Sequence, residues 1–136
     1  MSGRVFRIIL SERRYRFQPE ALRAHAPRRP GVYLLLAGDG GAPKVLYVGA
    51  AIPGRGETVY AALAGHLMGN LRPNKTDLLK HARDLYFEFL AEADVSAPED
   101  YLDIAGALAA RTPPCIKPPG KGLASGRYDS VSLEVS

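Results

Sequence analysis

The sequence has almost no cysteine and no long apolar run. Cys115 is the single cysteine, which excludes an internal disulfide and a cysteine metal cage and suits a reducing cytoplasm. No stretch of about 18 apolar residues is present, so no segment is expected to span a membrane. The N-terminal segment has arginine on both sides of a very short apolar run, residues 8–10, which is too short for a signal peptide, and it lacks a small-residue cleavage site.

Several catalytic motifs are missing as well. The sequence contains no HExxH and no His/Cys cluster with zinc spacing, and it has no GxSxG. The loop at residues 52–57, IPGRGE, lacks the spacing of a phosphate-binding P-loop. Zinc metalloproteases, serine hydrolases with a nucleophile elbow and P-loop NTPases therefore have no support.

The composition is that of a folded, basic protein. Of 136 residues, 46% are hydrophobic and 24% charged, which fits one globular domain over residues 1–136. A net charge of +4 favours an anionic partner such as nucleic acid. Residues 1–30 carry eight arginines against Glu12 and Glu20.

The segment at residues 85–110 has the opposite charge. It has no Lys or Arg and contains six acids: Glu88, Glu92, Asp94, Glu99, Asp100 and Asp103. This acidic block is either a divalent-metal pocket inside a phosphate-attracting surface or the solvated face of a helix, and the charges alone leave both open.

The order of patterns predicts an α+β fold. Expected strands cover residues 5–10, 31–38, 44–51, 85–92 and 130–136, and expected helices cover residues 19–26, 58–68, 76–84 and 96–110. The strands at 31–38 and 44–51 form a β-hairpin through a Gly-rich turn. We therefore expect a small central antiparallel or mixed sheet flanked by helices.

Two tyrosines mark the hairpin. Tyr33 stands in GVY and Tyr47 in YVG, and cross-strand partners in a hairpin lie about 5 Å apart, so the two phenols can meet. A phenol can orient a water molecule or a phosphate oxygen, and Gly49 leaves room for a close approach to the backbone. Tyrosines are also common in strands for structural reasons, and that interpretation stays open.

The two triplets, followed by a helix that carries His66, resemble the signature of the GIY-YIG nuclease family. The resemblance covers about residues 30–117 and leaves the N-terminal arm (1–29) and the C-terminal strand (118–136) outside. It implies an endonuclease that hydrolyses phosphodiesters with one Mg²⁺ or Mn²⁺ ion. The sequence departs from the family at Ala62, where an arginine is expected, and near Ile104, where a glutamate is expected.

The resemblance assigns roles to particular residues. Those expected in catalysis are Tyr33, Tyr47, His66 and, from the loop before the helix, Arg55. Gly49 and Lys117 are expected to contact phosphate, and so are Arg14 and Arg16 of the arginine-rich arm, which lies outside the resemblance. Asp100 and Asp103, the acids near Ile104 on the same expected helix, are expected to hold the metal. His25 and His81 are expected to be surface residues.

Three functions remain open at this stage. The chain is a metal-dependent nuclease acting on nucleic acid, with DNA the expected substrate, or a degenerate domain that binds nucleic acid without cutting it. The third is a module recruited to a protein or small ligand. The oligomeric state is left open.

Overall fold

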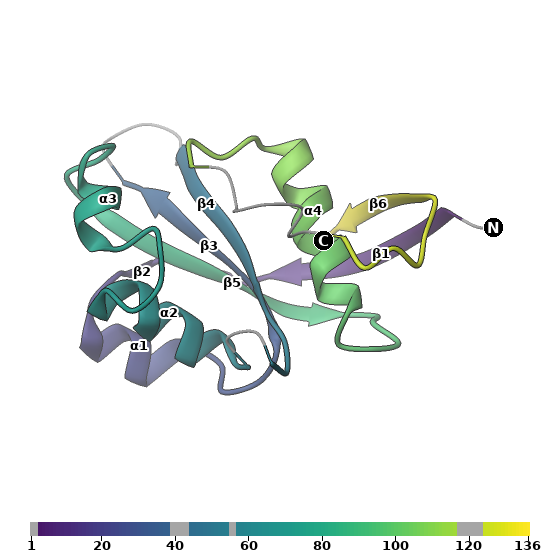
Figure 1. Ribbon diagram of the computed structural model, residues 1–136, viewed down its shortest axis with the longest axis horizontal. Helices are drawn as coiled ribbons and strands as arrows, with labels where there is room; N and C mark the ends of the chain where they lie inside the picture. The colour runs from purple at the N-terminus through teal and green to yellow at the C-terminus, as the bar shows by residue number, and fades with distance from the viewer. Residues whose placement is uncertain (1–2, 39–43, 55–56, 117–123) are drawn as a thin grey trace.

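The computed structural model describes residues 3–38, 44–54, 57–116 and 124–136. These residues form a six-stranded mixed sheet and four helices, which confirms the α+β prediction (Figure 1). The elements are β1 (Gly3–Leu10), β2 (Tyr15–Arg16), α1 (Pro19–His25), β3 (Gly31–Ala37), β4 (Lys44–Ala51), α2 (Val59–Met68), α3 (Lys75–Leu79), β5 (Leu85–Ala93), α4 (Asp100–Arg111) and β6 (Ser130–Val135).

The hairpin of β3 and β4 lies at one end of the sheet. The strand order is β4-β3-β5-β1-β6, and the short β2 pairs with β5. All seven residues of β3 are buried, because this strand has a neighbour on each edge and side chains packed on both faces. Tyr33 pairs with Gly49, and the register shifts between Leu35 and Leu36, so β4 has one extra residue.

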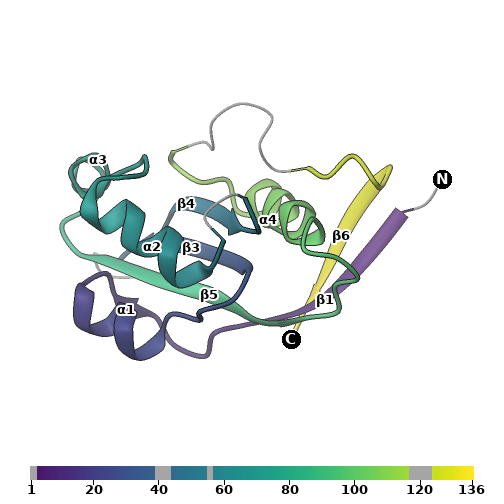
Figure 2. The same cartoon turned by 60° about the horizontal axis from the view of Figure 1, so that its bottom comes forward.

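Two apolar cores lie on opposite faces of the sheet. Alternate residues of β3 belong to different cores, Tyr33 and Leu35 to one and Val32 and Leu34 to the other. The first core includes residues of α1, α2 and α3, and the second includes residues of α4. Figures 1 and 2 show α1, α2 and α3 together on one side of the molecule and α4 on the other.

Two helix starts show how local sequence sets the elements. Asn74 caps α3 by accepting from the Asp77 amide, and the Asp77 carboxylate accepts from the Asn74 amide in return. The prediction that α4 starts after Ser96 was wrong, because the helix begins at Asp100. The Asp100 carboxylate accepts from the amides of Ser96 and Ala97, so the preceding segment is a turn held by this side chain.

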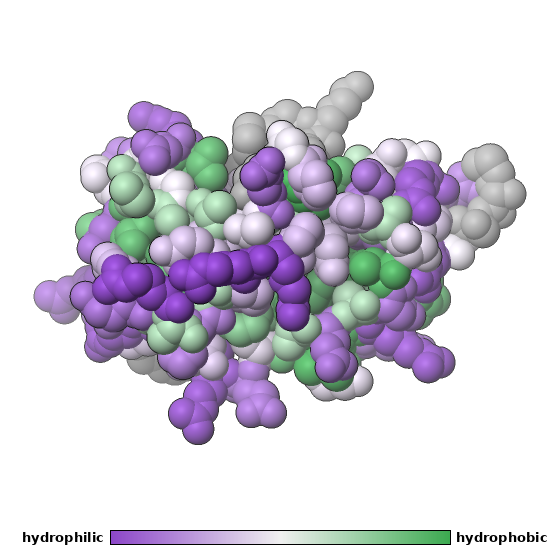
Figure 3. Space-filling view, turned by 90° about the horizontal axis from the view of Figure 1, so that it is seen from below, coloured by the Kyte–Doolittle hydropathy of each residue, from purple (hydrophilic) through white to green (hydrophobic). Residues whose placement is uncertain are grey.

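The arm and the C-terminal strand complete the sheet. β1 pairs antiparallel with β5 and parallel with β6, so both segments outside the GIY-YIG resemblance are hydrogen-bonded into the same structure. Among the described residues, no helix has the length and apolar character needed to cross a bilayer. The face seen in Figure 3 is largely hydrophilic, with apolar side chains only in small patches.

Candidate functional site

Tyr33, Tyr47 and His66 form one buried cluster on the α2 face of the sheet. Tyr33 comes from β3, Tyr47 from β4 and His66 from the last turn of α2. The ring centroids are 6.4 Å apart between the two tyrosines, 5.5 Å between Tyr33 and His66, and 5.3 Å between Tyr47 and His66. The structure therefore brings together three of the four residues expected in catalysis.

Hydrogen bonds fix the tautomer of His66. Its Nδ1 lies 2.8 Å from the carbonyl oxygen of Pro73, which can only accept, so Nδ1 carries the proton. Its Nε2 lies 2.8 Å from the Tyr33 hydroxyl and accepts from it. Burial lowers the pKa of His66 below 6.5, although the bond to Pro73 acts in the opposite direction. The result is a neutral relay in which Tyr33 donates to His66 and His66 donates to a backbone carbonyl.

Gly49 makes room for this cluster. A Cβ atom at this position would overlap the Cζ and Oη atoms of Tyr33, because the phenol lies directly across β4. The space that the sequence suggested for a phosphate is therefore filled by a tyrosine ring. Ala62, where the resemblance expects an arginine, is buried in the same apolar core and supplies no charge.

A cleft of about 340 Å³ opens beside Tyr47. Its other lining residues come from the segment around α3 and from the segment after α4, and are Arg72, Pro73, Asp77, Lys80, His81 and Ile116. The sequence interpretation missed Arg72 and Lys80 and expected His81 to be an isolated surface residue. The cleft thus places cationic side chains next to the Tyr33–His66 relay.

The donors around this cleft do not fit a divalent metal. Mg²⁺ and Mn²⁺ prefer several oxygen ligands, usually including carboxylates. Asp77 is the carboxylate that lines the cleft, and its Oδ2 already accepts from the Asn74 amide and lies 3.9 Å from Arg72. Among the described residues, no group of three or more His, Cys, Asp or Glu side chains is arranged to hold an ion.

Asp100 and Asp103, the expected metal ligands, lie on α4 and not at the tyrosine cluster. Asp100 is fully buried, and its carboxylate accepts from Ser96, Ala97, Arg127 and Tyr128. Asp103 accepts from the Ser125 amide through Oδ1. α4 packs its neighbouring residue Ile104 into the second core, across the sheet from Tyr33. These two carboxylates hold the C-terminal segment against α4.

Charge and hydrogen bonding set the ionisation of Asp100. Burial raises the pKa of this carboxyl, but the bonds from Ser96, Tyr128 and Ala97 and the charge of Arg127 outweigh it, so the pKa is below its ordinary value. The hydrogen bond to Asp100, together with burial, raises the pKa of Tyr128. The partners of the Asp100 carboxylate thus hold parts of the fold together.

Six exposed cations form a surface that we call the basic belt. They are Arg14, Arg16, Arg72, Lys75, Lys80 and Arg83. Arg16, Lys75 and Arg83 line one shallow pocket at one side of α3, and Arg72 and Lys80 line the cleft beside Tyr47. The guanidinium groups of Arg14 and Arg16 lie 5.4 and 5.5 Å from the ring centroid of Tyr86.

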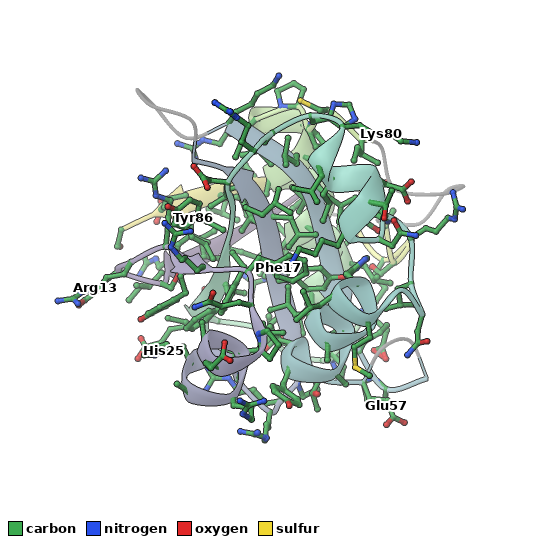
Figure 4. The ribbon with its side chains drawn as sticks, turned by 90° about the vertical axis from the view of Figure 1, so that its left-hand side faces the viewer. Arg13, Phe17, His25, Glu57, Lys80 and Tyr86 are labelled. Carbon is green, nitrogen blue, oxygen red and sulfur yellow. The ribbon has the colours of Figure 1, made fainter. Side chains whose placement is uncertain are left out.

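Figure 4 looks onto this side of the molecule, with Lys80 beside α3 and Tyr86 near the arm that carries Arg13. Two acids interrupt the belt, since Asp84 pairs with Arg16 at 3.9 Å and Asp77 with Arg72. The two arginines expected to contact phosphate, Arg14 and Arg16, therefore lie on a surface that also includes the edge of the cleft.

Arg55 and Lys117, two further expected site residues, lie outside the described residues. Comparison of the chain with protein-family models, with curated proteins and with solved structures finds no match. The function therefore has to be inferred from the chain's own residues.

Proposed function

We propose that this chain is a GIY-YIG-like domain that binds nucleic acid, with DNA as the expected ligand, and does not cut it. The observation that carries the proposal is the basic belt, which leads into the cleft beside Tyr47. A reducing cytoplasm, consistent with the single exposed Cys115, is part of the same proposal.

The belt has the chemistry that a phosphate backbone needs. Arginine and lysine side chains at a surface neutralise phosphates and release counterions, which supplies affinity without sequence specificity. Tyr86, which is partly exposed beside Arg14 and Arg16, adds an aromatic ring on which an unpaired base can stack. These features favour a ligand with phosphates and accessible bases.

Binding without cleavage follows from what surrounds the relay. A single-metal nuclease needs carboxylate oxygens for its ion and a cation at the phosphoryl group. Ala62 supplies no such cation, and Asp100 and Asp103 are held by the C-terminal segment on the other face. The Tyr33 hydroxyl donates to His66 inside a cluster in which each of the three side chains is less than a tenth exposed.

Metal-dependent cleavage is the second candidate, and one observation favours it. His66 is neutral and its Nε2 accepts from Tyr33, so it is placed to take the phenol proton when Tyr33 activates water. Cleavage would need a carboxylate that reaches this cluster on ligand binding.

Binding is tested by fluorescence anisotropy with single-stranded and duplex DNA over a range of salt concentrations. We expect the logarithm of the affinity to fall linearly with the logarithm of the salt concentration. Lys80→Ala and Arg72→Ala should each weaken binding to all sequences and reduce this slope by about 1. Arg7→Ala, an exposed arginine of β1 outside the belt, is the matched control and should change neither quantity.

Two results would overturn the binding part of the proposal: binding that does not depend on salt, or belt variants that behave like Arg7→Ala. The second candidate is tested with plasmid and single-stranded DNA in Mg²⁺, in Mn²⁺ and in chelator. Cleavage that needs the metal and disappears in Tyr33→Phe would establish the nuclease and refute binding without cutting.

A further inference from the structure

β6 is the last strand of the sheet and pairs on one side only. Its neighbour is β1, and among the described residues no strand follows it in the sheet order. Exposed edge strands usually carry Lys, Pro or a bulge that prevents further pairing. The segment from Ser130 to Ser136 has none of these, and its register with β1 is unbroken from Ser130 to Val135.

The ladder with β1 shows which backbone groups of β6 face outward. The Ser136 amide donates to the Ile8 carbonyl, so the even-numbered residues of β6 direct their N–H and C=O groups toward β1. The odd-numbered residues, Val131, Leu133 and Val135, direct theirs to the open edge. Within the described part of the chain, no backbone hydrogen bond reaches these three residues from that side.

The sequence of this edge is nearly symmetric about Leu133. Ser130 matches Ser136, Val131 matches Val135, and Ser132 stands opposite Glu134. An antiparallel pair of two such strands, related by a two-fold axis at Leu133, therefore places apolar residues against apolar residues.

The same register fits the hydrogen bonds and the charges. Val131 faces Val135 of the second copy and Leu133 faces its own equivalent, and these are the residues whose backbone groups point outward. Glu134 faces Ser132 of the second copy, so the two glutamates do not oppose each other. Within its own chain Glu134 already pairs with Arg7 at 3.3 Å.

We propose that β6 pairs with β6 of a second copy of this chain, joining two sheets into one across a two-fold axis at Leu133. The apolar face that Leu133 and Val131 share with the α4 core then continues from one copy to the next. A dimer of this kind carries the basic belt twice, which raises the affinity for a long nucleic acid when both belts reach it.

Substitutions of Ser132 can test the proposed dimer by strengthening it or by weakening it. Its side chain is exposed and belongs to the face opposite the α4 core, beside Val5, so substitution there leaves the second core intact. Ser132→Lys places a cation opposite Glu134 of the second copy, twice per dimer, and Ser132→Glu places an anion there. We expect the dimer dissociation constant to fall in the first variant and rise in the second, each by about 2- to 30-fold.

Sedimentation equilibrium over a wide range of protein concentration measures these constants, and thermal melting of dilute samples checks that both variants stay folded. Hydrogen exchange of the wild-type protein gives a second measurement. The amides of Val131, Leu133 and Val135 should become protected as concentration rises, while that of Ser136 is protected throughout.

A wild-type protein that stays monomeric at all concentrations would overturn the proposal. So would a dimer that both Ser132 substitutions shift in the same direction or leave unchanged, or an assembly that grows beyond the dimer. If either variant fails to fold, the exchange pattern of the wild-type amides alone decides between the proposal and its rejection.

Discussion

The two faces of the sheet bury polar networks of different kinds. On the α2 face, Tyr33, His66 and the Pro73 carbonyl form a neutral relay. On the α4 face, Asp100 is an ionised carboxylate with two backbone and two side-chain donors. The two networks satisfy their central groups by different chemistry, but the buried Oδ2 of Asp103, on the same helix as Asp100, has no hydrogen-bond partner among the described residues.

The difference separates a site from a structural clamp. The neutral relay borders the cleft beside Tyr47, which the cations Arg72 and Lys80 also line. The charged network binds only other parts of the chain. Its donors come from the turn before α4 and from the segment at residues 125–128. A carboxylate whose lone pairs are all engaged holds a fold together more readily than it binds a ligand. The proposed phosphate contacts are therefore on the α2 face, where Arg72 and Lys80 line the cleft.

The largest expected effect is on the α4 face. Asp100→Ala removes the acceptor of four hydrogen bonds and leaves the Ser96 and Ala97 amides without their partner. We expect the free energy of unfolding to fall by about 2–4 kcal/mol, measured by urea denaturation. Glu99→Ala, at the exposed preceding position, is the control and should stay within about 0.5 kcal/mol of wild type. A small loss at Asp100 would mean that the C-terminal segment is held by its strand pairing instead.

The next effect is on the α2 face, at Gly49. Gly49→Ala forces the Tyr33 ring away from β4 and breaks its bond to His66, so we expect a loss of about 1–3 kcal/mol. The cause is tested by a double-mutant cycle with Tyr33→Ala, which removes the ring. The added methyl group should then cost much less than in the wild-type background. Purely additive losses would show that Gly49 is needed for its backbone and not for Tyr33.

Much of the fold followed from the sequence, and the exceptions have physical causes. Alternating and continuous apolar runs predicted β3, β4 and β5, because burial of one or both faces imposes those patterns. The two-residue β2 and the register shift opposite Leu35 and Leu36 leave too short a signature to detect. α4 was expected to start after Ser96, since local capping rules do not include Arg127 and Tyr128, which meet Asp100 from far along the chain.

The candidate site was only partly predictable for the same reason. The hairpin pattern placed Tyr33 and Tyr47 on one face, and the helix after it supplied His66. The Pro73 carbonyl that orients His66 is a backbone atom and has no sequence signature. Asp100 and Asp103 were expected at the metal because they lie near Ile104, where the resemblance expects a glutamate, and no local pattern tells which face of the sheet the helix covers.

The pH dependence of stability distinguishes the two networks. The pKa of His66 is lowered in the folded protein, so below its ordinary value of 6.5 the unfolded chain binds a proton that the folded chain does not. His66 therefore contributes a loss of stability as the pH falls through about 6.5, with a slope of at most about 1.4 kcal/mol per pH unit.

Asp100, with a lowered pKa, keeps its contribution until the pH falls below 3.8 and loses it as the pH approaches the folded value. Urea denaturation at several pH values measures both regions. His66→Gln should flatten the profile between about pH 7 and pH 5 and leave the acidic fall unchanged. An unaltered profile in this variant would contradict the burial of a neutral His66.

The smallest expected effect on stability is at Arg127. It shows which donors to Asp100 stabilise the fold. Its Nη1 lies 2.8 Å from Asp100 Oδ1, but the side chain is 41% exposed, so solvent screens the pair. We expect Arg127→Ala to lower the free energy of unfolding by about 0.5–1 kcal/mol, less at high salt, with exposed Arg111→Ala as the control. If Arg127→Ala instead costs as much as Asp100→Ala, the ion pair holds the clamp. If it costs as little as expected, the backbone amides and the Tyr128 hydroxyl hold it, and the α4 face depends on charge less than its composition suggests.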